Sequence, residues 1–375
     1  MKIAHVIGSC GSGGAEMLVK SLLPYLKALG AELELWVMTR VFDAYPEDKV
    51  RTDFENSFVD DLEKTGIPVR FVGKRPRRDW HKTRVGLNEL FRSFSPNVVH
   101  SHLESVSFHV GRSLDERPIK VQTVHSTRIE YRALHKIYLG RRFDTYIAIS
   151  NSLREIIQHS LGLPKSKVST IYNGVDLERF DVADRHFNAE VKNIVAVGRL
   201  TPAKDYPNLL NAYSLLVHLL KKEKTAIPRL SIVGDGDLRK DIESMIRSLK
   251  LQNHVELLGV RKDIPEILRR ADIYVMSSEW EGLSIALIEA LAAGLPIVAS
   301  NAGSNNEIVE NGVSGLIVPI KNPQALAKSL YDLIANREMR ESFSIAAAKR
   351  AEIFSIETCA QKHMDLYREL MKDSK

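Results

Sequence analysis

The chain has 375 residues, 44 % hydrophobic and 27 % charged, a balance that excludes collagenous, disordered and disulfide-stapled proteins. Its two cysteines, Cys10 and Cys359, lie near opposite ends and fit no zinc or disulfide spacing, so we expect a reducing cytosol as the compartment. The net charge of +6 is concentrated, because residues 64–92 hold nine basic and two acidic side chains.

Apolar runs of four to seven residues alternate with amphipathic stretches of about ten to fifteen, which predicts repeated βα units around parallel sheets. The predicted strands are Lys2–Ile7, Glu32–Met38, Asn97–His102, Lys120–Val124 and Thr145–Ile149, then Asn193–Val197, Arg229–Val233, His254–Leu257, Asp272–Met276, Pro296–Ala299 and Gly315–Val318. A polar stretch near 181–192 separates the two series. We therefore predict doubly wound domains over residues 1–185 and 186–355, followed by a C-terminal helical segment over 356–375.

The N-terminal segment is glycine-rich and predicts a loop after the first strand. Glycines interrupt the first apolar run, so we expect no secretory signal peptide, and no stretch is apolar enough to predict a membrane-spanning helix. Gly13 and Gly14 lie between the first strand and a helix, where backbone N–H groups can approach a phosphate or a sugar. The Gly-x-Gly-x-x-Gly motif that binds NAD is incomplete here, because Glu16 occupies the position of its third glycine. Arg40, at the end of the next predicted strand, leaves NADP binding as a poor alternative. A tight turn without a ligand is the alternative.

Histidines follow the predicted strands of the first domain. His100 and His102 share one face of a strand, so a two-histidine metal site is conceivable, but only Glu104 offers a nearby carboxylate. His125 ends the next strand, where it suits a polar substrate or a proton transfer. A structural histidine is the alternative at this position.

The second domain opens with two cations at the end of its first strand. Arg199 follows that strand directly, and Lys204 lies five residues later, before a helix. A planar guanidinium fork and a point charge at this place suit a pyrophosphate. Solvated loop charges are the alternative.

Two glutamates flank the start of a strongly apolar helix. Glu281 precedes the helix and can reach a ligand beside free backbone N–H groups, whereas Glu289 lies within the helix between apolar neighbours. A buried carboxylate needs hydrogen-bond donors, and a ribose diol would supply them. The alternative is a helix cap at Glu281 and a salt bridge at Glu289.

An Asp-x-Asp sequence follows another strand. Asp235 and Asp237 match the manganese-binding sequence of some transferases. A helix follows directly, so helix capping by Asp237 explains that residue without a metal.

Together these segments resemble the retaining glycosyltransferases of family four, and the resemblance covers nearly the whole chain. EGLSIALIE matches the family's E-x7-E signature as Glu281 and Glu289, and GRLTPAKD matches its paired basic element as Arg199 and Lys204. GGAE, TVHST, ISNS and YNGVDLERF match in order. The resemblance implies the α/β fold called GT-B, with two Rossmann-like domains facing across a cleft and the C-terminal helix packing back on the first domain.

The resemblance also implies roles for particular residues. Arg199 and Lys204 would clamp the donor diphosphate, and Glu289 would accept hydrogen bonds from the ribose. Hydroxyls of the transferred sugar would meet Glu281, Gly282, Leu283 and Ser284. The remaining donor-site residues would be Gly13 and Gly14 in the first domain, His125 near the reacting sugar, and Val260 and Arg261 near the base.

The implied reaction is a retaining, metal-independent transfer of a hexosyl or N-acetylhexosaminyl group from a nucleotide sugar to a glycan or lipid-linked acceptor. UDP is the expected nucleotide, no cofactor or metal is expected, and bacterial surface polysaccharide, such as capsule or lipopolysaccharide, is the expected product. Leu283, Ser284 and Ile285 depart from the Phe or Pro common there in the family, which leaves the sugar open. A non-catalytic or regulatory sugar-nucleotide-binding protein of the same fold is the alternative.

The basic segment lies in the predicted acceptor domain. Lys74, Arg75, Arg77 and Arg78 precede Trp80, and such a group can bind anionic lipid, so we expect peripheral attachment to the cytoplasmic face of the plasma membrane. A solvated loop is the alternative. We expect no nucleic-acid partner, because Trp80 is the segment's only aromatic residue and no recognition motif appears.

Overall fold

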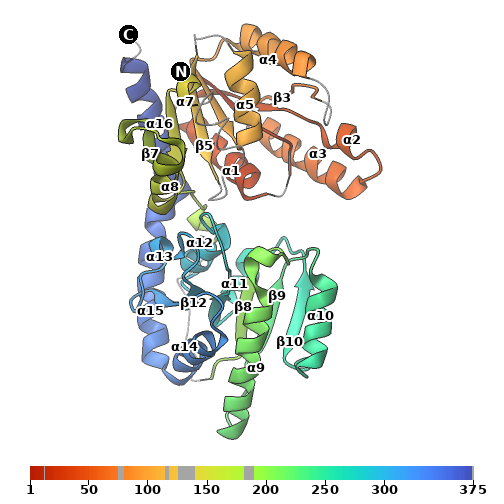
Figure 1. Cartoon of the computed structure of the whole chain (residues 1–375), viewed down its shortest axis with the longest axis vertical. Helices are drawn as coiled ribbons and strands as arrows, with labels where there is room; N and C mark the ends of the chain where they lie inside the picture. Colours follow the sequence, from red (N-terminus) through yellow and green to blue (C-terminus); the bar gives the residue numbers. More distant parts are fainter. Residues whose placement is uncertain (12, 75–79, 115–117, 126–139, 181–189, 374–375) are drawn as a thin grey trace. The chain divides into compact units, whose positions relative to one another are not determined.

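A computed structural model describes residues 1–11, 13–74, 80–114, 118–125, 140–180 and 190–373 (Figure 1). These residues form two compact units, one of 1–174 with 356–375 and one of 175–355. The division at Gly174 precedes the predicted linker, most of which lies outside the described residues. The helix at the C-terminal end of the chain is thus part of unit 1.

Unit 1 is built on a seven-stranded parallel sheet with the order β3-β2-β1-β4-β5-β6-β7. Its strands are β1 Lys2–Ile7, β2 Glu32–Val37, β3 Val69–Phe71, β4 Val98–His102, β5 Ile119–Val124, β6 Thr145–Ala148 and β7 Val168–Thr170. Its helices are α1 Gly14–Ala28, α2 Val41–Ala44, α3 Lys49–Lys64, α4 Trp80–Phe94, α5 Glu104–Ser113, α7 Gly140–Arg142, α8 Asn151–Leu161 and α16 Ile356–Asp373.

Helix α16 is held in unit 1 by its apolar face. Ile356, Cys359, Ala360, Met364 and Tyr367 recur at helical spacing and are buried in one core with α1 and the sheet. Close packing demands a glycine below the start of the helix, because a Cβ at Gly174 would lie 2.6 Å from the Ile356 Cα. Both cysteines are free and buried.

Unit 2 is built on a six-stranded parallel sheet with the order β10-β9-β8-β11-β12-β13. Its strands are β8 Asn193–Val197, β9 Arg229–Val233, β10 Val255–Gly259, β11 Ile273–Met276, β12 Ile297–Ser300 and β13 Gly315–Val318. Its helices are α9 Tyr206–Lys222, α10 Arg239–Ser248, α11 Ile264–Arg269, α12 Ile285–Ala292, α13 Asn305–Ile308, α14 Pro323–Ala335 and α15 Arg337–Ala351.

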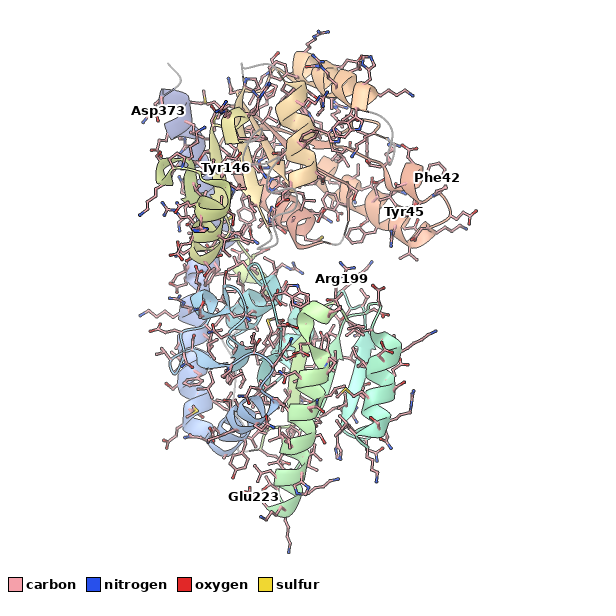
Figure 2. All side chains as sticks on the ribbon, viewed as in Figure 1. Phe42, Tyr45, Tyr146, Arg199, Glu223 and Asp373 are labelled. Carbon is pink, nitrogen blue, oxygen red and sulfur yellow. The ribbon has the colours of Figure 1, made fainter. Side chains whose placement is uncertain are left out.

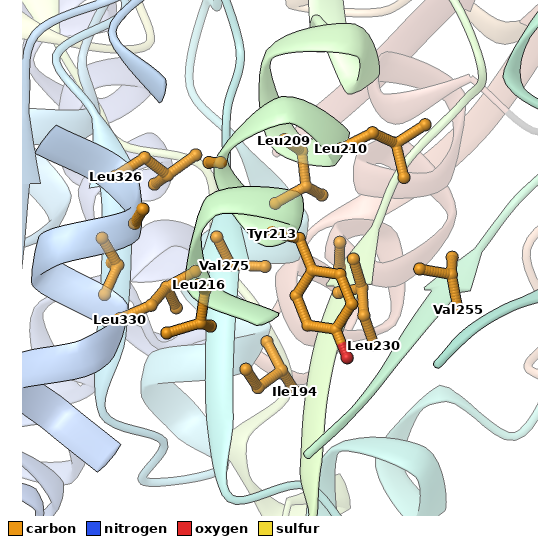
Figure 3. Packing of buried hydrophobic residues seen from close by; sticks show 14 of the residues in the cluster. Ile194, Leu209, Leu210, Tyr213, Leu216, Leu230, Val255, Val275, Leu326 and Leu330 are labelled. Carbon is orange, nitrogen blue, oxygen red and sulfur yellow. The ribbon is translucent and has the colours of Figure 1, made fainter. Parts of the chain in front are cut away.

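The core of unit 2 lies where α9 and α14 cover the sheet (Figure 3). Leu209 and Leu216 of α9 and Leu330 of α14 pack on Ile194 and Val275 from the two central strands. Those strands, β8 and β11, are also where the strand order reverses. In doubly wound sheets such a reversal opens a crevice at the carboxyl ends of the strands, which is where ligands bind.

Candidate functional site

The reversal in unit 2 brings two predicted site residues into contact. Lys204 ends a short 3-10 helix after β8, and Glu281 lies in the loop after β11. The Lys204 Nζ lies 2.5 Å from Oε1 of Glu281, and both side chains are largely buried. Ser278 also donates a hydrogen bond to this oxygen at 2.6 Å. Lys204 and Glu281 therefore form one polar group at the carboxyl ends of neighbouring strands.

Backbone contacts fix the two loops that carry this pair. Ser277 Oγ donates to the carbonyl oxygens of Lys204 and Asp205 at 2.9 and 3.0 Å, and Ser300 Oγ donates to Ser278 O at 2.5 Å. Gly303 packs against the Glu281 backbone with φ +54°, and a Cβ there would lie 2.1 Å from the Glu281 carbonyl oxygen. The loop thus requires glycine at that position.

Arg199 is placed differently from Lys204. It lies two residues beyond β8 and is exposed, and its side chain makes no hydrogen bond or ion pair with the described residues. Figure 2 shows its side chain extending from the ribbon of unit 2. The guanidinium is therefore available to an anionic ligand without breaking an internal contact.

Helix α12 carries the second glutamate. Burial raises the pKa of the Glu289 carboxyl to about 7, and the positive charge of Arg179 opposes this shift. The Glu289 carboxyl makes no hydrogen bond with the described residues. A carboxyl in this state is poised to accept hydrogen bonds from a bound polar ligand.

Further polar atoms near these loops lack a partner. Ser284 is the N-cap of α12, yet its hydroxyl makes no capping bond. Its Oγ, Ser304 Oγ and Asn305 Oδ1 are buried without hydrogen-bond partners among the described residues. Buried polar groups are normally paired, so these atoms are candidates for ligand contacts.

Val260 and Arg261 lie after β10, at the edge of the sheet. Val260 is 79 % exposed. Arg261 donates to both oxygens of Asp263 at 2.8 and 2.7 Å, and this hydrogen-bonded contact lowers the pKa of Asp263 to about 2. Neither residue touches the Lys204–Glu281 pair in the described contacts.

In the Asp-x-Asp segment, the Asp235 carboxylate is bound by neighbouring residues. Asp235 accepts from the Gly236 N–H at 2.7 Å and pairs with Arg239 at 3.3 Å. The prediction that Asp237 caps the following helix is wrong: Leu238 is the N-cap of α10, and no side-chain capping bond is made. The tight turn at Gly236 delays the helix start beyond Asp237.

The predicted residues of unit 1 follow two strands on either side of β4: Gly13 and Gly14 follow β1, at the strand-order reversal, and His125 follows β5. Gly13 is the N-cap of α1 and Gly14 its first residue, and a Cβ at Gly14 would meet open space. His125 directly follows β5 and is half-buried. Its Nε2 lies 3.1 Å from Nδ1 of His102, which is fully buried in β4.

Three buried imidazoles lie close enough to surround an ion. The candidate ligand atoms of His5, His100 and His102 all lie within 4.8 Å of one another. However, His100 already bonds Tyr367 and Thr123 through its two ring nitrogens, at 2.6 and 2.7 Å. Binding a metal here would cost existing hydrogen bonds.

Both units match models of known families. Residues 12–179 match the model "Glycosyltransferase Family 4", and residues 179–350 match "Glycosyl transferases group 1". The chain is a family-four glycosyltransferase.

Relatives of this glycosyltransferase include two bacterial enzymes. It is 28 % identical over 314 residues to the Escherichia coli UDP-Gal:alpha-D-GlcNAc-diphosphoundecaprenol alpha-1,3-galactosyltransferase, covering 77 % of this chain and 80 % of that one. It is 25 % identical over 382 residues to the Campylobacter jejuni N-acetylgalactosamine-N,N'-diacetylbacillosaminyl-diphospho-undecaprenol 4-alpha-N-acetylgalactosaminyltransferase, covering 94 % and 95 %.

Solved structures share the fold of this glycosyltransferase. Anabaena HepE in complex with UDP superposes with a TM-score of 0.82 at 19 % identity, over 98 % of this chain and all (100 %) of that one. A glycosyltransferase from Rickettsia africae superposes with a TM-score of 0.79 at 19 % identity, over 99 % and 98 %. The predicted GT-B fold, with two Rossmann-like parallel-sheet units, is confirmed.

Sequence reasoning missed several residues that shape the site of this glycosyltransferase. Ser277 and Ser278 anchor the loops, Gly303 admits the Glu281 backbone, and Arg179 sets the charge near Glu289. The paired serines after β11 were the available signal, because polar residues at the end of an apolar strand face the crevice.

Part of the basic segment of this glycosyltransferase lies outside the described residues, namely Arg75, Arg77 and Arg78. Lys74 is half-buried, and burial lowers its pKa. Trp80 is 53 % exposed, with its ring 5.1 Å from Phe108 and the Arg112 guanidinium 5.7 Å from its centroid. Within the described ranges, no helix combines the length and apolar character needed to cross a bilayer.

Proposed function

We propose that this enzyme transfers a hexosyl or N-acetylhexosaminyl group from a UDP-sugar to a hydroxyl of a lipid-linked glycan, with retention at the anomeric carbon and without a metal. The observation that carries the proposal is the Lys204–Glu281 pair at the strand-order reversal of unit 2, with the exposed Arg199 in the same segment after β8 as Lys204. Positive charge at this crevice suits a diphosphate leaving group.

The chemistry follows from these groups. The acceptor oxygen forms a bond to the anomeric carbon while the bond from that carbon to the diphosphate breaks. The departing diphosphate oxygen takes the acceptor's proton from the same face of the sugar, so the configuration is retained. Arg199 and Lys204 stabilise the negative charge that builds on the diphosphate.

Neighbouring groups would position the donor. Glu281, Gly282 and the N-terminal N–H groups of α12 at Leu283 and Ser284 would meet hydroxyls of the transferred sugar. Glu289 would accept from the ribose diol. Val260 and Arg261 would lie near the base.

The choice of UDP and of a lipid-linked acceptor is supported by the relatives. The Escherichia coli enzyme is named for UDP-Gal, and both bacterial relatives are named for acceptors linked to undecaprenol through diphosphate. Surface polysaccharide or lipid-linked oligosaccharide synthesis is the matching process.

A donor screen tests the nucleotide. Thermal unfolding should be measured with UDP, GDP and ADP, because a ligand at a hundred times its Kd stabilises the folded state by about 2.7 kcal/mol. We expect UDP to raise Tm most, and a larger rise with GDP or ADP would overturn the choice of UDP. Incubation with several UDP-sugars would then identify the sugar that is transferred or hydrolysed.

Attachment to the cytoplasmic face of the membrane is part of the proposal. Lys74, Arg75, Arg77 and Arg78 would contribute attraction of about 1 kcal/mol each to an anionic lipid surface, with Trp80 at the interface. In liposome flotation we expect the enzyme to float with anionic vesicles at low salt and to be released at high salt. Absence of binding to anionic vesicles at low salt would refute the attachment.

A further inference from the structure

Three imidazoles in unit 1 form a continuous hydrogen-bonded chain. His5 Nδ1 of β1 lies 3.0 Å from His102 Nε2 of β4, and His102 Nδ1 lies 3.1 Å from His125 Nε2 after β5. His5 and His102 are completely buried in the sheet, whereas His125 is half-buried at its carboxyl end. These hydrogen-bonded imidazoles therefore run from the core of unit 1 to the carboxyl end of its sheet.

The three rings are neutral near pH 7. Burial is the main cause that lowers the pKa of His5 to about 3 and of His125 to about 4, and it holds the pKa of His102 well below its ordinary value. Nearby His363 of α16 acts in the same direction on all three. Each ring then carries one N–H donor and one bare nitrogen acceptor.

The middle ring forces both hydrogen bonds to run in the same direction. If His102 donates through Nδ1 to His125, its Nε2 must accept from His5, and His125 is left with an N–H at Nδ1. If His102 donates through Nε2 to His5, its Nδ1 must accept from His125, and His125 is left with a bare Nδ1. The tautomer of His125 is thus tied to the tautomer of His5, two rings away.

Burial of the far end favours the first arrangement. His5 Nε2 is fully buried and has no hydrogen-bond partner among the described residues. The first arrangement leaves only a lone pair there, whereas the second would leave an unpaired N–H in the core. Orphaned buried N–H groups are rarer than unsatisfied acceptors. The first arrangement also moves the spare donor to His125, where a ligand can use it.

We propose that His5 and His102 are positioning residues that hold His125 as its Nδ1–H tautomer, so that His125 offers the substrate a hydrogen-bond donor and not a base. This inference rests on the proposed function in supplying a substrate with hydroxyl or phosphate oxygens for His125 to meet. A donor at this place would stabilise negative charge on an oxygen of the nucleotide sugar.

His100 provides a matched control in the same strand. It is completely buried, and its ring stacks on His102 with centroids 4.3 Å apart. Its two ring nitrogens bond Tyr367 and Thr123, so His100 is not part of the hydrogen-bonded series His5–His102–His125. Replacing His100 should lower the stability about as much as replacing His102, but it should not change which tautomer of His125 is favoured.

The test is NMR of the full-length protein labelled with ¹³C and ¹⁵N in its 12 histidines, with the His125 signals assigned by their loss in His125→Gln. In the wild-type protein we expect the Nδ1–H tautomer. In His102→Phe we expect a shift to the Nε2–H form that predominates in free imidazole side chains, whereas His100→Phe should keep Nδ1–H. A wild-type Nε2–H tautomer, or one unchanged in His102→Phe, would overturn the proposal.

Kinetics give an independent reading. We expect kcat to fall roughly tenfold in His102→Phe, with KM little changed. Because His102 and His125 act as one unit, the double variant His102→Phe/His125→Phe should be no slower than His125→Phe alone. Additive losses would overturn the proposal. Full activity of His125→Phe would instead refute the role of His125 in meeting the substrate, while NMR would still report the tautomer.

Metal analysis completes the test. The purified protein should be assayed for bound Zn²⁺ and titrated with Zn²⁺ while the His102 signals are followed. We expect no stoichiometric binding. One bound ion that breaks the hydrogen bond between His5 and His102 would overturn the proposal that these residues position His125.

Discussion

The two cations of the proposed diphosphate site differ in how the fold holds them. The Arg199 side chain is exposed and makes no hydrogen bond or ion pair with the described residues, whereas Lys204 is the partner of a largely buried carboxylate. Loss of the first removes charge only, and loss of the second also leaves the Glu281 carboxylate with Ser278 as its one hydrogen-bond donor among the described residues.

This difference predicts separable effects on activity and stability. Arg199→Ala should lower kcat by about a hundredfold or more and leave Tm unchanged. Lys204→Met should lower kcat similarly and also reduce the free energy of unfolding by about 2–3 kcal/mol. Urea unfolding and steady-state transfer measure the two quantities.

The control is the double variant Lys204→Met/Glu281→Gln. It removes both charges together, so it should be more stable than Lys204→Met alone while remaining inactive. A Lys204→Met protein as stable as the wild type would contradict the structural role of the pair.

Glu289 predicts a pH-dependent stability. Burial raises its pKa from the ordinary 4.5 to about 7 in the folded protein, so the folded state binds more protons between these values and stability falls as pH rises through this range. Glu289→Gln should therefore raise the free energy of unfolding at pH 8, by about 3 kcal/mol at most, and have little effect at pH 4.

The same substitution should weaken UDP binding, because an amide replaces the carboxylate offered to the ribose diol. Calorimetric titration with UDP at pH 8 measures this loss. A variant that is destabilised at pH 8, or that binds UDP as tightly as the wild type, would refute the assignment of Glu289.

The sequence identified Lys204 and Glu281 separately, but it could not pair them. They are 77 positions apart, and only the adjacency of β8 and β11 brings their loops together. The ion pair of Arg261 with Asp263 was also missed, although only Lys262 separates them. Short-range charge pairs depend on loop geometry that spacing alone does not fix.

At the scale of elements, the two strand series were predictable because buried parallel strands are continuous apolar runs. The strands β3 and β7 were missed, since each has three residues at a sheet edge and is too short to show a pattern. Helix starts were less certain, as Asp237 illustrates. The pairing between elements came only from the structure.

The loop after β11 depends on one glycine. Gly303→Ala should shift the Glu281 loop, because its φ is +54° and its Cβ would overlap the Glu281 carbonyl oxygen. We expect loss of more than 2 kcal/mol of stability and at least a tenfold lower kcat. Thermal unfolding and transfer assays check both.

Gly312 is the matched control, because its φ is +78° but a Cβ there meets nothing within 4 Å. Gly312→Ala should cost only about 1 kcal/mol of backbone strain and retain activity. Equal effects of the two substitutions would show that backbone strain, and not contact with Glu281, explains the glycine at 303.

At the scale of the whole molecule, the last helix belongs to the first unit. Removing residues 356–375 would expose the apolar face of the sheet in unit 1 and remove the Tyr367 hydroxyl that bonds His100. We expect hydrogen exchange to accelerate in β1 and β4, while the strands of unit 2 keep their protection. Unchanged protection in β1 would contradict this role of α16.

The central claim is a retaining transfer whose leaving-group charge is stabilised by protein cations. The most direct test follows the anomeric configuration of the product by ¹H NMR, with the identified UDP-sugar, a lipid-linked acceptor and EDTA present. We expect product of the donor's configuration, formed at an undiminished rate in EDTA and about a hundredfold more slowly by Arg199→Ala. Inverted product, or loss of turnover in EDTA, would contradict it.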